Sequence, residues 1–138
     1  MQELSLHDFP LITFDKVRYA DTDRQGHVNN AVFSTFLETG RVEFLYNQEH
    51  KLLAEGASFV IAALNLSFLH EIGWPGKVDI GTGIVHIGTS SIKIHQQIYQ
   101  NGRCAASAET IIVQTKDNRS LPLSDAAKAT LQQWLLQR

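Results

Sequence analysis

The chain has 138 residues, which is the size of one domain and leaves no room for two separate hydrophobic cores. Hydrophobic residues make up 43% and charged residues 19%, which excludes a disordered chain, a collagen-like repeat and a coiled coil. The formal net charge is -2 and the 12 Lys and Arg residues are scattered, so we expect neither nucleic acid nor an anionic membrane as a partner.

The cysteine content and the length of the apolar stretches indicate the cellular compartment of the protein. Cys104 is the single cysteine, so an internal disulfide is impossible, and no Cys/His spacing resembles a zinc site. The first residues lack a basic segment followed by an apolar run, and no apolar stretch approaches the roughly 20 residues of a membrane span. We expect one cytoplasmic domain over residues 1–138, without metal and without membrane insertion.

The first half of the chain predicts a strand, a polar loop and a long helix. Alternation over residues 13–20 predicts a short strand, and the polar segment 21–29 follows it as a loop. Asn29 or Asn30 can cap a helix that we expect over residues 30–49. Gly40 falls among the aromatic residues of the apolar helix face, although glycine costs about 1 kcal/mol there. This position predicts that a sheet packs closely against the helix.

The second half predicts four strands and a short helix. A period of two predicts a strand over residues 60–69 with one strongly apolar face, and residues 74–76 break it. Further strands follow over residues 77–87, between the turns at 88–90 and 101–102, and over 104–115, with Asn101-Gly102 as a tight hairpin turn. Ser124 and Asp125 can cap a short terminal helix. We predict an α+β fold in which a curved antiparallel sheet, joined by short turns, wraps around a long central helix.

The junction between the first strand and the long helix concentrates polar chemistry. It contains Asp21, Asp23, His27, Asn29 and Asn30 within a few residues. A carboxylate beside a helix start can act as a general base or nucleophile, while the free helix N–H groups stabilise an oxyanion. These groups are the parts of an acyl-transfer site.

The same loop admits other interpretations. Asp21 and Asp23 can instead form an Asx turn that initiates the helix, and His27 can be a hydrogen-bonded structural residue. The spacing of the acidic residues also mimics a calcium-binding loop, but Val32 stands where a bidentate glutamate is required, so we exclude calcium.

The sequence resembles a known family at these residues. The segments that carry the resemblance are Asp21-Thr22-Asp23, Gly26-His27-Val28-Asn29-Asn30, Phe33 with Glu38-x-x-Arg41, Asp79, and Ile87-Gly88-Thr89-Ser90-Ser91. They look like the signature of hotdog-fold acyl-CoA thioesterases of the 4-hydroxybenzoyl-CoA thioesterase class. The His-Val-Asn-Asn box is also similar to that of acyl-carrier-protein thioesterases, although Gln25 replaces an asparagine of those enzymes.

The resemblance implies roles for individual residues. Asp23 would be the catalytic base or nucleophile, His27 would assist it, and the N–H of Asn30 would donate to the oxyanion. The substrate-binding positions are Asn29, which would shape the loop, Glu38, which with Arg41 would form an ion pair or line the acyl cleft, and Ser90 and Ser91, which would contact the pantetheine arm. Alternatively, Glu38 and Arg41 form only a surface ion pair, and Ser90 and Ser91 belong to a hairpin turn without a role in binding.

The resemblance also implies the reaction and the assembly. We expect hydrolysis of an acyl-CoA to free acid and CoA, without a cofactor because the CoA moiety is part of the substrate. The expected assembly is a homodimer, or a tetramer or hexamer of such dimers, with the site between protomers. The alternatives are an acyl-carrier-protein thioesterase, a non-catalytic hotdog protein that binds acyl-CoA or acyl-carrier protein, and a hotdog dehydratase.

Overall fold

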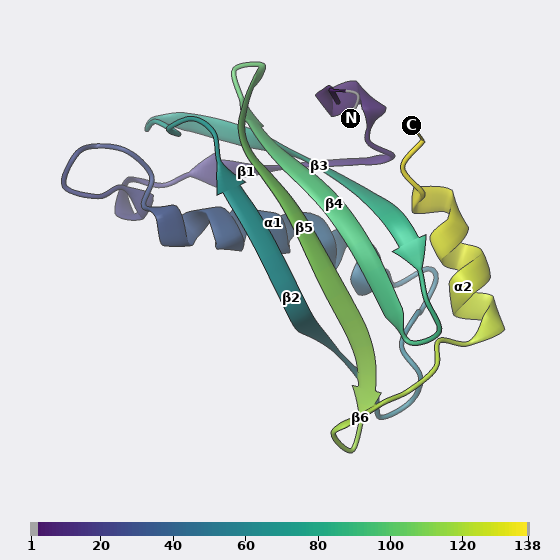
Figure 1. The fold of residues 1–138 in the computed structure, drawn as a ribbon. Helices are drawn as coiled ribbons and strands as arrows, with labels where there is room; N and C mark the ends of the chain where they lie inside the picture. The colour runs from purple at the N-terminus through teal and green to yellow at the C-terminus, as the bar shows by residue number, and fades with distance from the viewer. Residues whose placement is uncertain (1–2, 138) are drawn as a thin grey trace.

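The computed structural model describes residues 3–137, and these form one curled antiparallel sheet with a long helix across one face (Figure 1). The sheet order is β1-β3-β4-β5-β2, with β6 paired to β5. The predicted α+β hotdog fold is therefore confirmed. In chain order the elements are β1 (Leu11–Val17), α1 (Asn30–Leu45), β2 (Ser58–Phe68), β3 (Gly76–Ile87), β4 (Ser91–Gln100), β5 (Arg103–Lys116), β6 (Arg119–Ser120) and α2 (Asp125–Leu131).

The apolar face of α1 packs on the sheet as the sequence predicts. Its buried residues include Phe33, Phe36, Leu37, Gly40 and Phe44. A Cβ atom at Gly40 would lie 2.8 Å from side-chain atoms of Ile80, Thr82 and Gln96 in the sheet, which is closer than van der Waals contact permits. The close approach is thus made by side chains of the sheet rather than by its backbone, and it fixes the height of α1 above the sheet.

The first strand and the long helix both end earlier than the sequence predicts, and local hydrogen bonds explain both ends. The first strand ends at Val17 because the N–H of Arg18 donates to Asp21 Oδ2 at 2.8 Å, which starts a 3-10 turn instead of continuing the strand. Helix α1 ends at Leu45, because Asn47 Oδ1 accepts hydrogen bonds from the N–H groups of two following residues and forms a turn.

Strand β2 departs most from the prediction. Only β3, β4 and β5 follow one another in the sheet through short turns, whereas β2 crosses to the far edge and pairs with β5. A bulge between Ile61 and Ala63 interrupts the predicted period of two and brings Ile61 to the same side of β2 as Leu64 and Phe68. These three apolar residues are 50%, 41% and 49% exposed. Helix α1 packs mainly over the neighbouring strands and leaves much of this edge strand exposed.

The remaining turn and cap predictions agree with the structure. Asn101 and Gly102 have φ values of 52° and 80°, as a tight hairpin turn requires. Ser124 Oγ accepts the N–H of Ala127 at 3.0 Å and caps α2. Within residues 3–137, no helix is long and apolar enough to cross a membrane.

Candidate active site

The loop before α1 is a compact, hydrogen-bonded turn. Thr22 and Val28 form an antiparallel bridge, and the N–H of Asp23 donates to the carbonyl of His27 at 2.8 Å. Gly26 closes the turn with φ +86°, a conformation that L side chains rarely adopt. The loop therefore holds Asp23 and His27 in a fixed relation before the helix begins.

Asp21 is the structural carboxylate of the loop. Its side chain is 2% exposed and accepts hydrogen bonds from Arg18, at 2.8 Å from the backbone N–H and 2.9 Å from Nη2. Burial alone would raise the pKa of Asp21, but the hydrogen bonds and charge of Arg18 outweigh it and lower that pKa. Because the Asp21 carbonyl also accepts the N–H of Asn29 at 2.8 Å, this residue holds the loop against the helix start.

Asp23 combines the turn-forming role with a free oxygen. Its Oδ1 accepts the N–H of Gln25 at 2.9 Å and the N–H of His27 at 3.3 Å, which is the Asx turn that the sequence also allows. Oδ2 has no hydrogen-bond partner within residues 3–137, and the side chain is exposed. One oxygen therefore orients the carboxylate while the other remains available for chemistry.

The imidazole of His27 has a partner that sequence reasoning missed. Its Nε2 lies 3.0 Å from Oε2 of Glu71, which follows β2 in the chain. A β-bridge between His27 and Gly73 brings the two segments together. Nothing in the sequence marks Glu71, because the pairing depends on a contact between segments more than forty residues apart.

The helix start has the predicted cap and one unused donor. Asn29 Oδ1 accepts the N–H of Ala31 at 2.9 Å, so Asn29 is the N-cap of α1. Within residues 3–137, the N–H of Asn30 has no hydrogen-bond acceptor. This N–H lies at the positive end of the helix dipole, where an anionic oxygen is stabilised.

These groups converge on one hollow of about 360 Å³ at the start of α1. It contains a carboxylate, an imidazole and the helix terminus beside two aromatic rings, and the end of β2 forms its other wall. Two of its residues, His70 and Glu71, had no signal in the sequence pattern. The lining residues are Asp23, Gln25, His27, Val28, Asn30, Phe33, Phe68, Leu69, His70 and Glu71.

Three of the predicted substrate-binding residues lie elsewhere in the fold. Glu38 and Arg41 line a separate hollow of about 110 Å³ between α1 and β2, and they form no ion pair in the described part of the chain. Ser90 and Ser91 form the β3–β4 turn, where Ser91 pairs with Val113 at the end of β5. That turn lies at the opposite end of the sheet from the Asp23 hollow.

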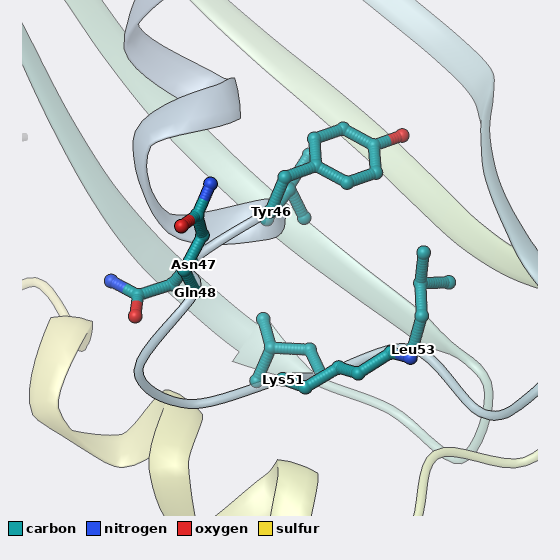
Figure 2. Close-up of a pocket in the computed structure, with 7 residues that line it drawn as sticks. Tyr46, Asn47, Gln48, Lys51 and Leu53 are labelled. Atoms are coloured by element: carbon teal, nitrogen blue, oxygen red, sulfur yellow. The ribbon is translucent and has the colours of Figure 1, made fainter.

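Another hollow, of about 290 Å³, lies where α1 ends; Figure 2 shows residues that line it. It is mostly apolar, and Tyr46, Asn47, Gln48, Lys51 and Leu53 contribute to its walls. It contains neither a carboxylate nor an imidazole, so it lacks the groups that acyl-transfer chemistry needs. Within residues 3–137, no group of three or more His, Cys, Asp or Glu side chains could hold a metal ion.

Comparisons with known proteins identify the superfamily of the chain. The sequence model of the thioesterase-like superfamily matches residues 17–137. A thioesterase from Thermus thermophilus, in complex with coenzyme A and Zn, is 28% identical with a TM-score of 0.80, over 91% of this chain and 94% of that one. No curated protein matches the chain.

Two more distant structures share the fold. The probable thioesterase YbaW from Escherichia coli is 24% identical with a TM-score of 0.74, over 91% of this chain and 98% of that one. The DHNA-CoA thioesterase from Staphylococcus aureus is 20% identical with a TM-score of 0.71, over 81% of this chain and 79% of that one.

Proposed function

Because the chain belongs to the thioesterase-like superfamily, we propose that it hydrolyses acyl-CoA thioesters to free acid and CoA at the Asp23 hollow. One observation carries the proposal. Asp23 and Asn30 line one open hollow, and within residues 3–137 one carboxylate oxygen of Asp23 and the N–H of Asn30 have no hydrogen-bond partner. Hydrolysis of a thioester needs these two groups, an acceptor for a proton or acyl group and a donor to the oxyanion.

The reaction can proceed through Asp23 as a general base. Oδ2 takes a proton from water as the water oxygen attacks the thioester carbon, and the carbonyl oxygen becomes an oxyanion that accepts the Asn30 N–H. The carbon–sulfur bond then breaks, and the proton passes to the departing sulfur, which gives free acid and CoA thiol. Alternatively, Oδ2 attacks the carbon directly, the carbon–sulfur bond breaks with release of CoA thiolate, and water hydrolyses the resulting anhydride to the free acid and the Asp23 carboxylate. Both routes use the same two groups.

His27 assists this carboxylate in two ways. Its backbone N–H donates to Asp23 Oδ1, which fixes the orientation of the carboxylate. Its ring lies in the same hollow and is held by Glu71, so it can carry a proton between the hollow and the exposed Glu71 carboxylate. We therefore assign His27 to orientation of Asp23 and to proton transfer.

The finer assignment is to the 4-hydroxybenzoyl-CoA thioesterase class, on the strength of the loop segments Asp21-Thr22-Asp23 and Gly26–Asn30. The Thermus thermophilus thioesterase, whose structure holds coenzyme A, supports CoA as the carrier. Acyl-carrier protein is the second candidate, because the loop is also similar to that of carrier-protein thioesterases.

The exposed edge strand supports a homodimer with the site at the interface. Strand β2 carries Ile61, Leu64 and Phe68 uncovered on the α1 side and Val60 uncovered on the other side. Pairing β2 with β2 of a second copy would bury these residues and remove the edge. Because Phe68 also lines the Asp23 hollow, the partner would contribute to the walls of the site. Tetramers or hexamers would be built from such dimers.

An antiparallel β2 pair would also give Ser90 and Ser91 access to the substrate. In the sheet, Ser91 is level with Val113 and Val60, near the start of β2, whereas the Asp23 hollow lies at the end of β2. Two antiparallel β2 strands place the start of one beside the end of the other. We propose that the turn of the partner subunit contacts the pantetheine arm, while Asn29 shapes the loop within its own subunit.

The test is release of CoA thiol from short, medium, long and aromatic acyl-CoAs by the native protein. Turnover of at least one substrate supports the proposal. Tight binding without turnover would instead support a non-catalytic acyl-CoA-binding protein, and turnover of acyl-carrier-protein substrates alone would change the carrier. Hydration of crotonyl-CoA without thiol release would indicate a dehydratase.

A further inference from the structure

Arg41 is a buried cation on α1 without a complete set of partners. Its surface is 5% exposed, and Nη1 is buried without a hydrogen-bond partner within residues 3–137. Arginine keeps its charge in proteins, so a buried guanidinium is costly unless an anion or acceptor compensates it. The proposed hydrolytic chemistry makes no use of this group.

The surroundings of Arg41 leave space for a small anionic group. It lines the hollow of about 110 Å³ between α1 and β2, in which Glu38 is the one other charged residue. Burial lowers the pKa of Arg41 and the Glu38 carboxylate acts in the opposite direction, yet the two side chains form no ion pair in the described part of the chain. The remaining walls are mostly apolar, so an anion there would interact with the guanidinium in a low-dielectric environment.

This hollow and the Asp23 hollow lie along the same seam between α1 and β2. Phe33 and Phe68 contact each other across the seam with ring centroids 5.1 Å apart, and both line the Asp23 hollow. Tyr46 and Phe59 make the corresponding contact at 6.2 Å, and both line the Arg41 hollow. Between the two aromatic pairs, the α1 side of β2 presents exposed apolar residues.

The distance from Asn30 to Arg41 along α1 determines how long an acyl group must be to reach from one residue to the other. Asn30 and Arg41 are eleven residues apart on α1, which is about 16 Å along the helix axis. A helical side chain leans back toward the N-terminus, which shortens the span to about 11–16 Å. An extended chain advances about 1.2 Å per bond, so roughly nine to thirteen bonds cover this span.

We propose that Arg41 binds a carboxylate at the far end of the acyl group, so that the preferred substrate is an ω-carboxyacyl thioester of about eight to twelve carbons. This inference rests on the proposed function and adds its substrate class. The guanidinium would hold the carboxylate with charge-assisted hydrogen bonds while the Asn30 N–H holds the thioester oxygen. Glu38 would weaken the interaction by repelling the same carboxylate.

The experiment compares matched substrates that differ in the terminal group. For suberoyl-CoA against octanoyl-CoA, and sebacoyl-CoA against decanoyl-CoA, we expect the native protein to prefer the carboxylated member by about 10- to 100-fold in kcat/KM. Arg41→Gln should abolish this preference, because kcat/KM should fall by about 10- to 100-fold more for the carboxylated member than for octanoyl-CoA. Arg41→Lys should retain part of the preference, and Glu38→Gln should increase it.

The outcomes separate the inference from the proposed function. Hydrolysis of both substrates without preference by the native protein would overturn the role of Arg41 and leave the thioesterase intact. An equal loss on both substrates in Arg41→Gln would also overturn it, since a structural role or a pair with the partner subunit predicts that result. If neither substrate is hydrolysed, calorimetric binding of the two acyl-CoAs decides: preferred binding of suberoyl-CoA retains the inference, and equal binding overturns it.

Discussion

Gly40→Ala tests whether the sheet sets the position of α1. The added methyl group would lie 2.8 Å from Ile80 Cγ2, Thr82 Oγ1 and Gln96 Nε2. Gln96 cannot simply move away, because its Nε2 donates to the Leu37 carbonyl and to Thr82 Oγ1, both at 3.0 Å. The substitution must therefore shift the helix or break these buried hydrogen bonds.

The opposing energies predict the sign of the effect. Replacing glycine by alanine in a helix stabilises it by about 1 kcal/mol. Overpacking a tight core costs about 1–3 kcal/mol, and each lost hydrogen bond costs about 1 kcal/mol more. We expect Gly40→Ala to lower the free energy of unfolding by about 1–3 kcal/mol. A shift of α1 would also displace the Asn30 N–H and reduce kcat, because oxyanion donors act only at the correct distance.

The assay is urea unfolding at one fixed protein concentration, with Thr35→Ala on the exposed side of α1 as the control for helix propensity. The double variant Gly40→Ala with Gln96→Ala should show a coupling energy, because the shorter side chain makes room for the methyl group. A Gly40→Ala protein that is more stable than the native protein by about 1 kcal/mol would refute the tight contact between α1 and the sheet.

Three further predictions follow from the loop, the buried arginine and the edge strand. Asp21→Ala should lower the free energy of unfolding at pH 7 by about 1–2 kcal/mol. Because the pKa of Asp21 is lowered in the folded protein, the native protein should lose this advantage over the variant as the pH falls below about 4. A variant whose free energy of unfolding falls with pH as steeply as that of the native protein would contradict the assignment. Arg41→Met should leave the free energy of unfolding in urea unchanged or raise it, because the substitution removes an incompletely paired buried charge. A decrease of about 3 kcal/mol or more in this free energy would show that the charge is fully paired. Leu64→Lys on β2 should convert the proposed dimer into a monomer by light scattering at micromolar concentration, and a native protein that is already monomeric would exclude the dimer.

Local chemistry explains why much of the fold could be predicted from the sequence. The start of α1 is encoded by Asn29, whose side chain caps the helix, and the hairpin at 101–102 is encoded by two residues that tolerate positive φ. Asp23, His27 and Asn30 could be placed in one hollow because they are close in sequence. Each of these features depends on residues that are near neighbours in the chain.

Features that depend on distant segments could not be predicted. The period of β2 indicates a buried face, but the single chain leaves that face exposed because α1 covers the neighbouring strands. Glu71 reaches His27 only through the crossover after β2. The turn containing Ser90 and Ser91 lies at the far end of the sheet, which the strand lengths alone do not reveal.

The most direct test of the central claim is the rate of thiol release by Asp23→Asn, with Asp125→Asn at the start of α2 as the matched control. An asparagine can still accept the N–H groups of Gln25 and His27 through Oδ1, so the loop should keep its shape while the charge is removed. We predict that kcat falls at least about a hundredfold in Asp23→Asn and stays unchanged in Asp125→Asn. Native turnover in Asp23→Asn would contradict the assignment of this carboxylate as the catalytic group.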